Sequence, residues 1–137
     1  MQLESQVCSL ELAKRLKELG VRQESYFYWS TDNGDKFFVD SEETYPIDAH
    51  YPRPKIVCAA FTVAELGEIL FQINYFNLEK TGYLNITTEM IDRHEGYFYR
   101  LTNNFSENII DDYKEADARA RLLIYFLENG LIKNEPK

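Results

Sequence analysis

The segment Lys114–Ile132 constrains the fold of this 137-residue chain more than any other. Between Glu115 and Glu128 it contains neither Gly nor Pro, and residues with high helix propensity dominate. The following Asn129-Gly130 is typical of a helix end, because Gly adopts a left-handed conformation without a steric penalty. At about 100° per residue, a narrow polar strip contains Asp117, Arg121 and Glu128, and the broad apolar remainder contains Ala116, Ala118, Ala120, Leu122, Leu123, Ile124, Phe126 and Leu127. A helix that is apolar over most of its circumference is a central one, so we predict that the chain packs around Glu115–Asn129.

Two further helices are predicted from apolar residues at helical spacing. They cover Leu10–Leu19 and Val63–Asn74. The second follows a capping box, in which the Thr62 and Glu65 side chains are expected to bond each other's backbone N–H groups. Gly67 borders the apolar face of this helix, which predicts close approach to a neighbouring element.

A β-hairpin is predicted between the first two helices. Ser25–Ser30 contains four successive aromatic residues, which favour a strand, and the tight turn at Asn33-Gly34 leads to an antiparallel strand at Lys36–Asp40. The segment Ser41–Lys55 holds three prolines, so no regular element is expected there. Further strands are predicted at Ile56–Phe61, Tyr83–Thr88 and Gly96–Thr102. The sequence thus predicts a single α+β domain over residues 1–137, with one antiparallel sheet of about four strands and three helices mainly on one face.

Charge and cysteine content exclude several classes of protein. The formal net charge of −8 repels phosphate backbones and anionic lipid, and no run of three basic residues offsets it. Cys8 and Cys58 are far apart and have no local partner, which favours a reduced, intracellular protein. No apolar run approaches the roughly 18 residues of a membrane span. We therefore expect a cytoplasmic protein that binds neither nucleic acid directly nor membranes.

Catalytic and metal-binding patterns are also absent from the sequence. The four residues Cys8, Cys58, His50 and His94 are scattered without the spacing of a zinc site, and no phosphate-binding glycine loop occurs. The carboxylate pair Asp111-Asp112 directly precedes the last helix, where one of the two is expected to act as the helix cap. We expect no metal site, no cofactor and no catalytic residue.

Four tyrosines and one arginine are the candidate binding residues. Period-2 alternation pairs Tyr26 with Tyr28, and Tyr97 with Tyr99, on the sheet face away from the helices. They are either half-buried tyrosines with hydrated hydroxyls or a contact surface for a protein partner. Arg119 falls inside the apolar arc of the last helix, where it either pairs with Glu115 or holds an anion with a buried guanidinium.

Three segments of the chain are similar to known sequences. Ser9–Trp29, Phe61–Leu70 and Ala116–Ile132 together cover about a third of the chain. They resemble a group of small acidic proteins of unassigned function found in phages, prophages and their bacterial hosts. The resemblance implies a bacterial or viral cytoplasmic setting and no particular activity.

These observations favour a small non-catalytic protein that contacts another protein, or a second copy of itself, through an aromatic-rich sheet face. One alternative is a small-molecule-binding domain or small enzyme with a pocket near Arg119 and residues 103–112. A second alternative is an acidic decoy that occupies the nucleic-acid-binding surface of another protein. A contiguous acidic face would favour the decoy, and a deep pocket with converging polar groups would favour the ligand-binding domain.

Overall fold

The structure is a computed structural model that describes residues 3–31, 36–41, 55–70, 86–93, 96–103 and 110–130. A short 3-10 turn precedes the first helix, and residues 63–70 form a helix that we call the middle helix. The remaining elements are α1 (Leu10–Glu18), β1 (Tyr28–Thr31), β2 (Phe37–Asp40), β3 (Lys55–Ala59), β4 (Ile86–Arg93), β5 (Gly96–Asn103), β6 (Ile110–Asp112) and α3 (Glu115–Glu128). No helix in these ranges is long and apolar enough to cross a membrane.

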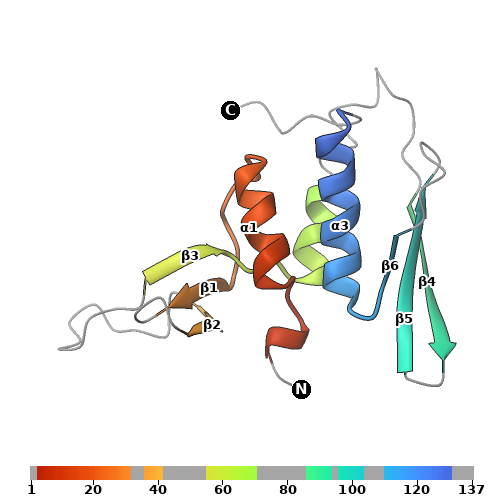
Figure 1. Ribbon diagram of the computed structural model, residues 1–137, viewed down its shortest axis with the longest axis horizontal. Coiled ribbons are helices and arrows are strands. Elements are labelled where there is room, and N and C mark those ends of the chain that lie inside the picture. Colours follow the sequence, from red (N-terminus) through yellow and green to blue (C-terminus); the bar gives the residue numbers. More distant parts are fainter. Residues whose placement is uncertain are drawn as a thin grey trace.

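The helices form a layer that lies between two antiparallel sheets (Figure 1). Within the described residues, the first sheet has the strand order β2-β1-β3 and the second has the order β4-β5-β6. Helix α1 contacts β3 of the first sheet, and α3 contacts β5 and β6 of the second. The α+β class and the antiparallel pairing are therefore confirmed.

The prediction of one sheet with about four strands is wrong, because the described strands form two sheets of three. The burial of α3 explains the difference. Its successive residues Leu122, Leu123 and Ile124 are at most 9% exposed, so the helix needs apolar neighbours around most of its circumference. In addition, β6 is a strand that the sequence analysis did not predict, and β4 continues to Arg93, beyond the predicted strand end at Thr88.

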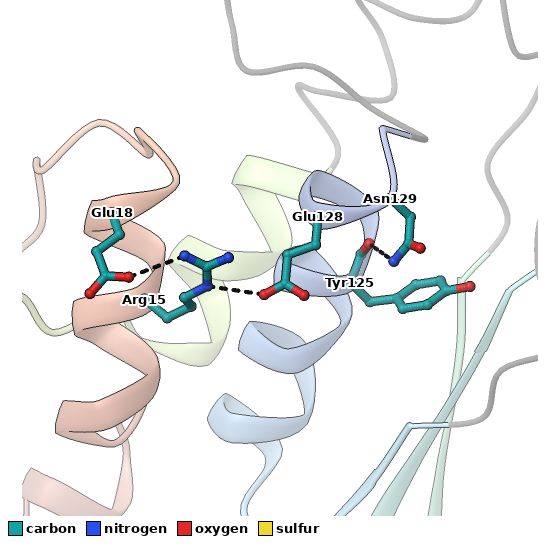
Figure 2. A network of polar contacts seen from close by, with 5 residues as sticks. All are labelled: Arg15, Glu18, Tyr125, Glu128 and Asn129. Carbon is teal, nitrogen blue, oxygen red and sulfur yellow. Dashed lines mark hydrogen bonds and ion pairs between the residues drawn. The ribbon is translucent and has the colours of Figure 1, made fainter.

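All three helices run in the same direction. The Asp117 carboxylate in the first turn of α3 accepts a hydrogen bond from the Ser9 N–H at the start of α1, at 2.6 Å. At the other end, Arg15 of α1 donates to Glu128 of α3 at 3.0 Å, and Figure 2 shows this guanidinium between Glu18 and Glu128. The middle helix begins beside α1, because the Cys8 N–H donates to the carbonyl oxygen of Phe61.

The polar strip of α3 connects this helix to its neighbours. Asp117 and Glu128 bond α1, as described above, and Arg121 donates to Asp112 of β6 at 2.8 Å. The three polar positions predicted from the helical wheel therefore fix α3 against both α1 and the second sheet.

The predicted helix ends are confirmed in part. The capping box of the middle helix is present, with Glu65 N–H donating to Thr62 Oγ1 and Thr62 N–H donating to the Glu65 carboxylate. Gly130 after α3 has a φ of 66°, as its role as a helix stop requires. The cap predicted for α3 is wrong, because Lys114 occupies that position and Asp112 instead accepts a hydrogen bond from the Lys114 N–H.

The predicted antiparallel hairpin is confirmed, with Trp29 of β1 opposite Val39 of β2. Its turn at Asn33-Gly34 lies outside the described residues, as do most of Ser41–Lys55 and residues 71–74 of the predicted second helix. Strand β1 begins at Tyr28, three residues later than predicted. The preceding residues bond the middle helix and its approach instead of a neighbouring strand.

Candidate interaction surfaces

The four candidate tyrosines belong to two different sheets. Tyr28 lies in β1 and Tyr26 lies just before it, whereas Tyr97 and Tyr99 lie in β5 of the second sheet. Because the helix layer separates the two sheets, the structure does not bring the four residues onto one face (Figure 1). The side chain of Tyr97 is outside the described part of the structure.

Tyr28 and Tyr99 contribute to folding. Both side chains are half-buried and pack against the hydrophobic core. The hydroxyl of Tyr28 also accepts a hydrogen bond from the Ser25 N–H at 3.4 Å. Replacing either residue would disturb the fold together with any binding, so neither can serve as a clean test of a contact surface.

Tyr26 is different, because its side chain is 78% exposed. Its backbone is nevertheless fixed: the Tyr26 N–H donates to Glu65 Oε2 at 3.2 Å. The residue before Tyr26 is also held, because Ser25 Oγ donates to Glu65 Oε1 at 2.9 Å. The residue after it is held as well, because the Phe27 N–H donates to Ser25 Oγ at 3.2 Å. The aromatic ring of Tyr26 therefore projects into solvent from a segment held on both sides.

Glu65 fixes the segment that carries Tyr26, and the sequence did not indicate this role. Its role as a capping residue was predicted from the spacing to Thr62, and that role is confirmed. Its bonds to Ser25 and Tyr26 span about forty residues of sequence, so no local pattern could indicate them. One carboxylate thus both caps the middle helix and fixes the segment that carries Tyr26.

Arg119 packs between α3 and the middle helix. Its Nη2 lies 3.5 Å from the Glu115 carboxylate, in agreement with the predicted pair along one helix face. Its Nε is buried and has no hydrogen-bond partner among the described residues, and its Nη1 lies against Gly67. The predicted close approach at Gly67 is thereby confirmed, and the neighbour is the guanidinium group.

The thiols of Cys8 and Cys58 are buried and free. Burial raises the pKa of Cys8 to about 12, and neighbouring charges change this value less. Such a thiol stays protonated at neutral pH and is a poor nucleophile or metal ligand. Among the described residues no group of three potential ligands could hold a metal ion, while His50 and His94 lie outside them.

Asp111 and Asp112 have separate structural roles. Asp111 accepts two hydrogen bonds from Arg100 of β5, at 2.9 and 3.1 Å, and these bonds raise the pKa of Arg100. Asp112 points to the other side of the strand, where it bonds the Lys114 N–H and Arg121. The two carboxylates therefore do not converge on a common site.

Comparison of the chain with protein families, with curated proteins and with solved structures finds no match in any of the three. Any functional conclusion therefore rests on the geometry of the residues described above.

Proposed function

We propose that this chain is a small, cytoplasmic, non-catalytic interaction protein of phage or bacterial origin. It contacts another protein chain, a second copy or a different protein, through the surface centred on Tyr26. The observation that carries the proposal is the 78% exposure of the Tyr26 side chain on a backbone bonded to Glu65.

Fixed aromatic residues are effective anchors in protein interfaces. A tyrosine supplies a large contact area and has few rotatable bonds, so ordering it costs little entropy. At Tyr26 the hydrogen bonds to Glu65 have already restricted the backbone, which lowers the cost further. Its phenol hydroxyl adds a polar group that can pair with a partner.

Contacts of the described residues limit the two alternatives. A pocket near Arg119 would use its guanidinium to hold a ligand, whereas Nη2 already lies near Glu115 and Nη1 lies against Gly67. Residues 104–109 of this alternative lie outside the described residues. An acidic decoy would need a contiguous face of unpaired carboxylates, and Asp111 and Asp117 are not available to it because they are bonded within the fold. The proposal includes no direct contact with nucleic acid or membrane, in line with the net charge of −8.

The experiment compares Tyr26 with a second exposed tyrosine. Tyr113, between β6 and α3, is 62% exposed and provides the matched control. A photo-crosslinking amino acid is placed at each position in turn, and products are sought with purified protein and with host lysate. Crosslinks are expected from position 26 and not from position 113.

Affinity measurements then quantify the contact. Tyr26→Ala should weaken binding to the crosslinked partner by about 2 kcal/mol or more if Tyr26 is a hot spot. Its unfolding free energy should change by less than about 0.5 kcal/mol, because the ring makes few intramolecular contacts. If the wild type sediments as a monomer and captures nothing, or if Tyr26→Ala and Tyr113→Ala bind equally, the proposal fails and the Arg119 pocket becomes the leading alternative.

A further inference from the structure

A second surface, separate from Tyr26, lies where α1 covers the first sheet. The ammonium of Lys14 in α1 is 5.1 Å from the centroid of the Phe37 ring in β2. Phe37 is nevertheless 39% exposed, so the lysine covers only part of the ring. This arrangement places a cation and an accessible apolar surface side by side.

Strand register brings a second lysine onto the same side of the sheet. Thr31 of β1 is directly opposite Phe37 on one side and Lys55 on the other. Directly opposite residues of antiparallel strands share a face, and a separation of two strands is about 10 Å. Lys55 therefore lies in one row with Phe37, on the side that faces α1.

A third lysine reaches this surface from α1. The Lys17 ammonium donates to the Val57 carbonyl oxygen of β3 at 2.8 Å, and an ammonium has two further N–H donors. Cys58 lies beneath these residues. Its pKa is raised by burial, and the positive charges of Lys17 and Lys14 partly oppose that rise. Both ammonium groups thus act on the same part of the sheet.

These lysines are not neutralised within the described part of the chain. Each ion pair between described residues uses an arginine, and none uses Lys14, Lys17 or Lys55. The three lysine side chains are also exposed. A protein with a net charge of −8 therefore places three lysines, none of them in an ion pair with a described carboxylate, beside the exposed Phe37.

We propose that the lysine face, formed by Lys14, Lys17, Lys55 and Phe37, binds an acidic segment of a partner protein. Carboxylates pair with the ammonium groups, and an apolar residue of the segment packs on the exposed part of the Phe37 ring. Salt at physiological concentration screens charges beyond about 8 Å. The carboxylates of a short segment therefore interact mainly with the lysine face, and the negative charges elsewhere on the protein repel them weakly. A long phosphate backbone extends beyond the face and meets that repulsion along its length.

The probe is a short fluorescein-labelled peptide that is rich in Glu and contains Leu, with binding followed by fluorescence anisotropy. The test variant is Lys14→Gln/Lys55→Gln. The control is Arg22→Gln/Lys114→Gln, which removes an equal number of positive charges outside the lysine face. Both variants are first compared with the wild type by circular dichroism and urea unfolding.

The test variant should bind the peptide about tenfold more weakly, because it loses two charge-assisted contacts. The control should stay within about twofold of the wild type, and added salt should weaken binding to the wild-type protein. Tyr26→Ala should leave peptide binding unchanged. A failure of the lysine-face proposal can therefore be distinguished from a failure of the proposed Tyr26 interaction. The inference is overturned if the wild type does not bind the peptide or if both double variants weaken binding equally. It is also overturned if a single-stranded oligonucleotide of equal charge binds more tightly and loses that affinity in the same test variant.

Discussion

A Cβ atom added at Gly67 would lie 2.8 Å from Nη1 of Arg119, closer than side chains normally approach. Alanine in a helix interior is ordinarily more stable than glycine by about 1 kcal/mol. We therefore expect Gly67→Ala to give little or none of this gain in the wild type, because the guanidinium must move. In an Arg119→Ala background the same substitution should give the full gain. Urea unfolding of the four proteins measures the coupling, and equal gains in both backgrounds would contradict the contact.

The hydrogen bond between Asp117 and Ser9 should stabilise the start of α1. Asp117→Ala removes the acceptor of the Ser9 N–H and should lower the unfolding free energy by about 1 kcal/mol, as expected for loss of a helix-capping interaction. Hydrogen exchange should then speed up at the first turn of α1 before it does so elsewhere. Glu11→Ala, an exposed acid in that turn, is the control and should change stability by less than about 0.5 kcal/mol. Equal effects of the two substitutions would show that Asp117 acts only through its charge.

The core of the helix layer should depend strongly on Leu123. This side chain is fully buried, so Leu123→Ala should cost about 2–5 kcal/mol through lost apolar contacts and a residual cavity. Arg121→Ala removes a half-exposed ion pair with Asp112 and should cost less than about 1 kcal/mol. Urea titration compares the two, and similar losses would mean that the buried face of α3 is assigned incorrectly.

Alkaline pH should destabilise the fold through the Cys8 thiol. The folded thiol has a pKa of about 12 and the ordinary value is 9.0, so between these values the unfolded chain binds fewer protons. The contribution to stability is complete below pH 9 and falls above it, by at most about 1.4 kcal/mol per pH unit. Cys8→Ala should reduce the slope of unfolding free energy against pH by the contribution of this one thiol. This expectation holds whatever the substitution does to stability at neutral pH. An unchanged slope in unfolding experiments above pH 9 would show that Cys8 ionises normally in the folded protein.

Local features of this chain could be read from the sequence because neighbouring residues determine them. The capping box of Thr62 and Glu65, the antiparallel pairing of the hairpin strands and the extent of α3 all depend on spacings of a few residues. The bonds from Glu65 to Tyr26 and the position of Lys14 over Phe37 join distant segments, and periodicity does not identify such partners. The second sheet had an indirect signal, since a helix as apolar as α3 needs cover on more than one side.

The contacts between α1 and α3 also determine when the protein can fold. The Ser9–Asp117 bond spans 108 residues of sequence and the Arg15–Glu128 bond spans 113. Contacts so distant in sequence form slowly, because the entropy of closing a long loop must be lost before they form. During synthesis, the apolar side of α1 and the buried Phe61 remain without α3 until Glu115–Glu128 has left the ribosome. The nascent chain therefore exposes this hydrophobic surface until α3 emerges, and α3 then covers it.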